Sequence, residues 1–96
     1  MRITEFQKDA IVDAVKAVDP NAKVWLFGSR VDDNKRGGDI DIAIYSDDIN
    51  RDVMRKIRVN RLICDKIGDQ RIDIVTTSDG KEAIFKIAVA EGVQLN

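Results

Sequence analysis

Asp39 and Asp41 stand two positions apart inside an apolar run, and Asp73 occupies a similar setting further along the chain. In DIDIAIY the aspartates alternate with isoleucines, which is typical of a strand with one buried face and one open face. RIDIV repeats this alternation around Asp73. If the two strands are neighbours in one sheet, the three carboxylates converge on one patch. Like charges within ~4 to 6 Å repel strongly, so a bound cation would be needed to neutralise such a patch.

The cation that suits carboxylate oxygens is a hard divalent ion. Mg²⁺ usually combines one or two protein carboxylates with phosphate oxygens of a substrate. A place for those phosphates is offered by Gly28-Ser29, where another apolar run ends. Glycine lets a ligand approach the backbone, and free N–H groups at a helix start hold anions. Arg30, Lys35 and Arg36 follow in the same loop. Together these residues predict phosphoryl or nucleotidyl transfer.

Other kinds of site lack the residues that they need. The sequence contains no histidine and one cysteine, Cys64, and it has no Walker-type loop or Gly-x-Gly-x-x-Gly. Histidine-based acid–base catalysis and an internal disulfide are therefore excluded, and a soft-metal site is disfavoured. We expect Cys64 to be a buried structural thiol. The loop DDNKRGGDID does not match a calcium loop, because Arg36 and Ala43 occupy ligand positions.

Length and composition indicate one globular domain over residues 1–96, with 44% apolar and 34% charged residues. The formal charge of -1 gives no overall attraction to nucleic acid. No run approaches the ~18 apolar residues that would cross a bilayer, and the N-terminus lacks the apolar core of a signal peptide. We therefore expect a cytoplasmic protein with no membrane contact.

Turn residues and hydrophobic periodicity predict the elements that position the aspartates. Thr4 and Gln7 match a capping box, which predicts a helix that ends before Asp19. KVWLF predicts a strand ending at Gly28, and the following loop could begin with a short helix. The remaining predicted elements are a strand at 39–45, a helix at 49–67, a strand at 71–75 and a helix at 81–91. This order, α-β-(α)-β-α-β-α, indicates an α/β or compact α+β fold, a small mixed sheet of three or more strands with helices packed against it.

The predicted helix at 49–67 has an apolar side and a basic side. The apolar side comprises Ile49, Val53, Ile57, Ile63, Cys64 and Ile67. The basic residues are Arg51, Arg55, Lys56, Arg58 and Arg61. We expect a solvated basic face, and contact with nucleic acid or an acidic partner stays an alternative. Met54 and Leu62 lie outside the apolar stripe and leave a homo-oligomer open. Four aromatic residues are expected in the core: Phe6, Trp25, Phe27 and Phe85.

The pattern of Gly28-Ser29, a spacer, Asp-x-Asp at 39–41 and a later Asp73 resembles the signature of nucleotidyltransferases related to DNA polymerase beta. In size and pattern the chain looks like a minimal nucleotidyltransferase (MNT), a stand-alone catalytic core that often acts with a separate helical HEPN protein. The resemblance covers nearly all 96 residues. It implies the polymerase beta-like nucleotidyltransferase fold.

The resemblance also implies roles for the aspartates. Asp39 and Asp41 would bind both of two Mg²⁺ ions, and Asp73 would hold the catalytic ion and help to activate an acceptor hydroxyl. That hydroxyl would attack the α-phosphorus of an NTP, and pyrophosphate would leave. On the phosphate side, Gly28 and Ser29 would contact the β- and γ-phosphates. Many minimal members carry a second arginine shortly after Gly-Ser, and Arg36 is the candidate substitute here, alongside Arg30.

The function expected from these residues is transfer of a nucleoside monophosphate, AMP from ATP, to a hydroxyl of a partner protein. The resemblance makes the partner a HEPN-type toxin and this chain its antitoxin. The alternative is a binding module that neutralises its partner by occupancy, with a vestigial metal site. A third possibility is antibiotic nucleotidylation by a fragment of a larger enzyme. The base of the nucleotide, the acceptor and the oligomeric state are left open.

Overall fold

The computed structural model of the chain describes residues 3–28 and 38–96. The elements in these residues are α1 (Glu5–Val18), β1 (Lys23–Phe27), β2 (Ile40–Tyr45), α2 (Asp47–Arg51), α3 (Val53–Ile67), β3 (Ile72–Thr77), α4 (Ala83–Glu91) and β4 (Val93–Gln94). The strands form one sheet in the order β3-β2-β1-β4. β2 pairs with β3 in parallel, and β1 is antiparallel to both β2 and β4. The predicted α/β fold with a mixed sheet is therefore confirmed.

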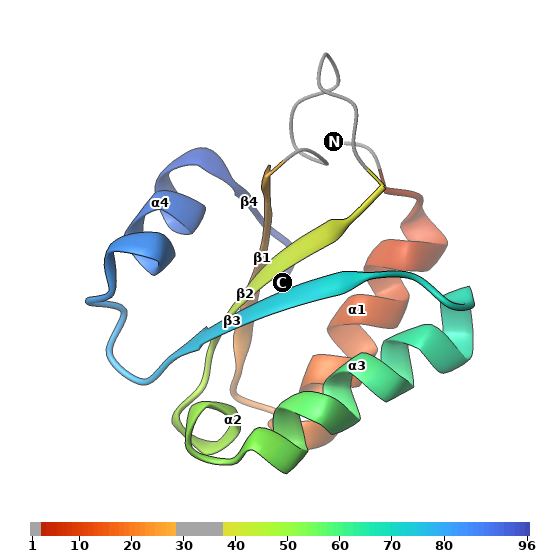
Figure 1. Cartoon of the computed structure of the whole chain (residues 1–96), viewed down its shortest axis with the longest axis horizontal. Helices are drawn as coiled ribbons and strands as arrows, with labels where there is room; N and C mark the ends of the chain where they lie inside the picture. Colours follow the sequence, from red (N-terminus) through yellow and green to blue (C-terminus); the bar gives the residue numbers. More distant parts are fainter. Residues whose placement is uncertain (1–2, 29–37) are drawn as a thin grey trace.

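The sheet lies between two helical layers (Figure 1). On one face Ile40, Ile42 and Ile44 are fully buried in a core shared with α1 and α3. On the other face Ala43 packs in a smaller cluster with Phe85 of α4. Because side chains alternate along a strand, Asp41 lies on the α4 side of the sheet while its isoleucine neighbours point to the main core. The predicted separation of aspartates from isoleucines is confirmed.

Helix α1 begins and ends where the sequence predicts. The Thr4 hydroxyl accepts a hydrogen bond from the Gln7 N–H at 3.0 Å, and the Gln7 side chain accepts one from the Thr4 N–H at 2.9 Å. After α1, the backbone is extended at Asp19, whose carboxylate accepts a 2.6 Å hydrogen bond from the hydroxyl of Ser46. This buried contact ties the end of α1 to the start of α2, beyond the far end of β2 from Asp41.

The single helix predicted at 49–67 is wrong, because the structure has two helices there, α2 and α3. Asp52 ends α2 with an extended backbone (φ -133°) and caps α3 by accepting a hydrogen bond from the Met54 N–H at 2.9 Å. Ser46 caps α2 in the same way. The last helix begins at Ala83 rather than at residue 81, and β4 was not predicted. A strand of two residues carries no periodicity, and pairing with β1 alone defines it.

Several apolar residues expected in the core lie at the surface. The exposed fractions are 60% for Phe6, 67% for Val53 and 46% for Ile57. Cys64 is only half-buried, and its thiol contacts the side-chain oxygen of Asn60 at 3.4 Å. Periodicity groups these residues on one side of a helix, but the position of the neighbouring helix and sheet decides how much of that side is covered. The prediction for Phe85, which is buried, is confirmed.

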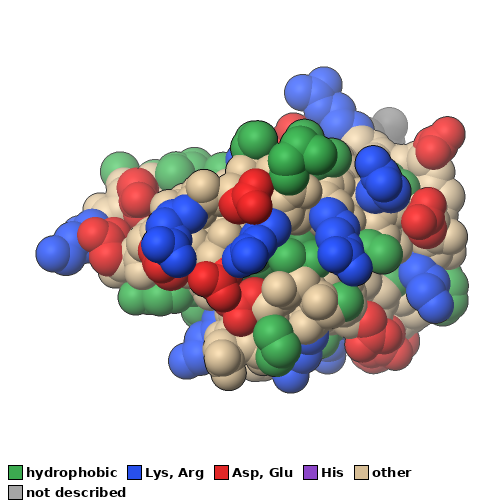
Figure 2. Space-filling model, turned by 90° about the horizontal axis from the view of Figure 1, so that it is seen from below, with side chains coloured by type: hydrophobic (Ala, Val, Ile, Leu, Met, Phe, Trp, Pro, Cys, Tyr) green, Lys and Arg blue, Asp and Glu red, His purple; other side chains and the backbone are tan. Residues whose placement is uncertain are grey.

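Basic and acidic side chains intermingle on the surface formed by α2 and α3 (Figure 2). Arg51 contacts Asp47 at 3.1 Å, and Arg55 contacts Asp52 at 3.6 Å. These pairs are exposed, so they fit the predicted solvated face, and nucleic-acid binding there stays an alternative. Across residues 3–28 and 38–96, no helix combines the length and apolar character that a bilayer crossing needs.

Candidate active site

Strand pairing places Asp41 next to Asp73. The two are direct register partners on the parallel strands β2 and β3, and each is the second residue of its strand. On the other side of β2, Phe27 at the end of β1 pairs with Asp41, so Gly28 follows at the same edge. Asp39 immediately precedes β2. The amino ends of two strands and the carboxyl end of a third thus bring three carboxylates and the glycine corner together.

Gly28 lies directly against the Asp41 carboxylate. Its backbone has φ +75°, and a Cβ added there would stand 2.4 Å from Oδ2 of Asp41. A side chain is therefore disfavoured by the left-handed backbone, and it would also require the Asp41 carboxylate to move. The group that approaches Gly28 in the structure is the Asp41 carboxylate, and the expected approach of a ligand to this glycine stays a prediction.

Arg71 is a member of the cluster that the sequence analysis did not select. Its Nε atom lies 3.6 Å from Oδ2 of Asp39 and 3.6 Å from Oδ1 of Asp73. Strand alternation could have indicated that Arg71 lies beside Asp73, because side chains two positions apart on a strand point to the same side. A guanidinium between two carboxylates offsets part of their repulsion.

Burial and the two neighbouring carboxylates both disfavour the ionised form of Asp41. Burial is the main cause that raises the pKa of Asp41 above its ordinary value of 3.8. The negative charge of Asp73, a hydrogen bond with Asp73 and the charge of Asp39 raise this pKa further, and Arg71 opposes them. The ionised form of Asp41 is therefore disfavoured, and a cation at this point would stabilise it.

The raised pKa of Asp41 predicts how stability depends on pH. A group whose pKa is higher in the folded state stabilises the fold below its unfolded pKa, here near 3.8, and loses that contribution as pH rises through the folded value. We expect Asp41→Asn to gain stability relative to wild type as pH rises from about 3.5 to 7. Urea denaturation of both proteins with a chelator present measures this difference. A difference that stays constant over the range would contradict the assignment.

Asp39, Asp41 and Asp73 fit Mg²⁺ as a ligand set, because all three offer carboxylate oxygens. A positive ion would also offset the repulsion that Asp73 and Asp39 exert on Asp41. In the described parts of the chain, however, no three acidic, histidine or cysteine side chains are already grouped as a finished ligand set. Arg71 contacts two of the carboxylates. Binding of an ion would therefore require side chains to turn toward a common point, which half-exposed aspartates permit.

The remaining predicted phosphate contacts fall on residues 29–37, outside the described residues. They are Ser29, Arg30, Lys35 and Arg36, together with the short helix expected after Gly28. Their roles stay predictions. At the end of this segment the carbonyl of Gly38 accepts a hydrogen bond from the side chain of Gln70, which links the approach to β2 with the approach to β3.

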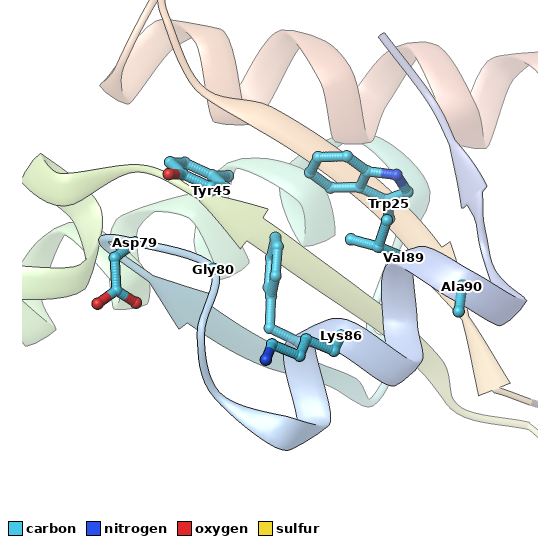
Figure 3. A pocket seen from close by; sticks show the side chains of 8 residues that line it. Trp25, Tyr45, Asp79, Gly80, Lys86, Val89 and Ala90 are labelled. Atoms are coloured by element: carbon cyan, nitrogen blue, oxygen red, sulfur yellow. The ribbon is translucent and has the colours of Figure 1, made fainter.

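A cavity of about 410 Å³ lies on the same side of the sheet, between α4 and the far end of β2 (Figure 3). Its lining includes Trp25, Tyr45 and Phe85. The Phe85 ring meets Trp25 edge to face at a centroid distance of 5.4 Å and Tyr45 at 5.7 Å. Tyr45 is four residues from Asp41, or about 13 Å along a strand. This apolar cavity is thus separate from the carboxylates.

The family comparison agrees with this arrangement. Residues 10–96 match the family described as polymerase beta, nucleotidyltransferase. The match includes Gly28, the three aspartates and Arg71. Comparison with curated proteins gives no match. The chain therefore belongs to the polymerase beta nucleotidyltransferase family.

Proposed function

We propose that the protein is a Mg²⁺-dependent nucleotidyltransferase that moves AMP from ATP to a hydroxyl of a partner protein. One observation carries the proposal. In a chain of this family, Asp41 and Asp73 are register partners on neighbouring strands, and Gly28 lies against Asp41. Carboxylates that can hold metal ions beside a glycine corner are what this reaction needs.

The aspartates have separate tasks in the proposed reaction. Asp39, Asp41 and Asp73 would hold the Mg²⁺ ions, which when bound neutralise phosphate charge and act as Lewis acids. The acceptor oxygen forms a bond to the α-phosphorus while the bond from that phosphorus to the pyrophosphate oxygen breaks. Asp73, half-exposed on β3, takes the hydroxyl proton. Pyrophosphate leaves with the negative charge.

The glycine corner would hold the leaving group. With no side chain at Gly28, the Asp41 carboxylate lies close to the backbone, and we expect phosphate oxygens to bind beside it. Ser29, Arg30 and Arg36 are proposed to bind the β- and γ-phosphates, since hydroxyl and guanidinium groups make charge-assisted bonds to them. Holding pyrophosphate in line with the attacking oxygen lowers the entropic part of the barrier.

A protein acceptor is supported by the apolar surface of α4. Ile84 is 47% exposed and Ile87 is 50% exposed, although Phe85 between them is buried in the core. A helix that is apolar on its outer side as well as its inner side marks a contact surface. The proposed partner is a helical HEPN-type protein that acts as a toxin. Its modification by this antitoxin would take place in the cytoplasm, where ATP and Mg²⁺ are available.

The experiment is to incubate the protein with Mg²⁺, each labelled NTP in turn, and the product of the adjacent reading frame. Intact-mass spectrometry then weighs both chains. The proposal expects the partner to gain one nucleoside monophosphate with ATP, and no gain when EDTA is present. Unmodified partner in a stable complex with this chain would favour the binding-module alternative. A nucleotide found on an added aminoglycoside, with the partner unmodified, would favour antibiotic nucleotidylation.

A further inference from the structure

We propose that Arg71 makes the site discriminate against a bare divalent ion and in favour of an ion that arrives with a nucleotide. This inference rests on the proposed function, because it concerns how the three aspartates receive their cation. It assigns Arg71 the part of a positioning residue that acts through Asp39 and Asp73.

The geometry makes Arg71 a competitor for the ion. Its Nε atom is 3.6 Å from an oxygen of Asp39 and 3.6 Å from an oxygen of Asp73, so one guanidinium serves both carboxylates. A divalent ion that used these oxygens would either displace the guanidinium or bind beside its positive charge. In both cases the bare ion binds less tightly than it would to the carboxylates alone.

Because the Arg71 and aspartate side chains are exposed, the guanidinium competes only weakly with a divalent ion. The Arg71 side chain is 74% exposed, and both carboxylate side chains are 47% exposed. Exposed ion pairs are weak and screened by salt, so the guanidinium can swing into solvent at small cost. We therefore expect Arg71 to weaken binding of the bare ion by roughly three- to tenfold rather than to block it.

Arg71 weakens the binding of a bare ion but strengthens the binding of an ion that is bound to a nucleotide. A divalent ion bound to a nucleoside triphosphate carries a net negative charge, and the Arg71 guanidinium attracts that complex instead of repelling it. The same residue thus opposes one ligand and favours the other.

The test uses Mn²⁺ alone and Mn²⁺ with α,β-methylene ATP, which binds without transfer. Binding to Arg71→Gln, Arg71→Lys, the wild type and the control Arg58→Gln is measured by calorimetry at fixed ionic strength. Arg58 lies on α3, the helix that packs on the opposite face of the sheet, and its replacement removes the same charge. Thermal unfolding reports whether each variant is folded.

The expected result for Arg71→Gln is roughly three- to tenfold tighter binding of bare Mn²⁺ and weaker binding of the Mn²⁺–nucleotide complex. Arg71→Lys and Arg58→Gln should stay close to wild type for both ligands. If Arg71→Gln binds bare Mn²⁺ no more tightly while the wild type transfers AMP, the inference falls and the proposed function stands. If no protein in the set binds Mn²⁺ saturably, both fall.

Discussion

Asp41→Asn is expected to lower AMP transfer by about a thousandfold or more. The carboxylate lies between Gly28 and Asp73, at the centre of the proposed metal site. Metal-held charge stabilisation is worth several kcal/mol, and about 1.4 kcal/mol changes a rate tenfold. The measurement is the rate of labelled AMP incorporation into the partner at saturating Mg²⁺ and ATP.

The loss can be separated from unfolding, because burial and neighbouring charges disfavour the ionised Asp41 in the folded chain. Asp41→Asn should therefore unfold at the same temperature as wild type, or higher, near neutral pH. A matched control is Asp48→Asn on α2, which removes an equal charge from an exposed ion pair with Arg51. That variant should keep full activity. Transfer by Asp41→Asn within tenfold of wild type would remove Asp41 from the proposed site.

Gly28→Ala is expected to cost both stability and activity, and Gly68→Ala to cost stability alone. Both glycines have positive φ, +75° and +91°, so alanine at either position is strained by about 1 to 3 kcal/mol, and more so at Gly68, where ψ is 175°. Only at Gly28 does the new Cβ meet a neighbour, Oδ2 of Asp41, whereas nothing lies within 4 Å at Gly68. The pair of variants therefore isolates displacement of the carboxylate from backbone strain.

Displacement of a reacting group by about 1 Å commonly costs 10²-fold in rate, so we expect Gly28→Ala to lose roughly a hundredfold in transfer. Gly68→Ala should lose less than about twofold once the folded fraction is taken into account. Urea denaturation and the AMP transfer assay measure the two effects. Equal activities for the two variants would show that the close approach at Gly28 has no part in the reaction.

Local chemistry was sufficient to predict most of the elements. Thr4 and Gln7 form the capping box that starts α1, and the alternation around Asp41 and Asp73 predicts strands with the correct faces buried. These signals succeed because a cap or an alternating pattern acts within a few residues of chain. The break at Asp52 was missed because the apolar and basic periodicity continues across it, although aspartate is a common helix cap.

The sequence predicted that the three carboxylates converge if their strands are neighbours, and only the structure shows that the strands pair and in which register. That Asp41 faces Asp73, and not the residue before or after it, follows from the register of two strands separated by α2 and α3. A shift of one residue would send Asp73 to the isoleucine core. Core packing of the isoleucines prevents that shift, and packing depends on residues far apart in the chain.

Residue order along the chain therefore specifies the chemistry available to this protein: carboxylates on strands, a glycine corner and no histidine. Three-dimensional packing specifies which of these groups act on one another. The contact of Arg71 with two aspartates, the closeness of Gly28 to the Asp41 carboxylate and the exposure of Ile87 on α4 all belong to this second class. Each depends on distances between separate elements, and those distances are set when the two cores close around the sheet.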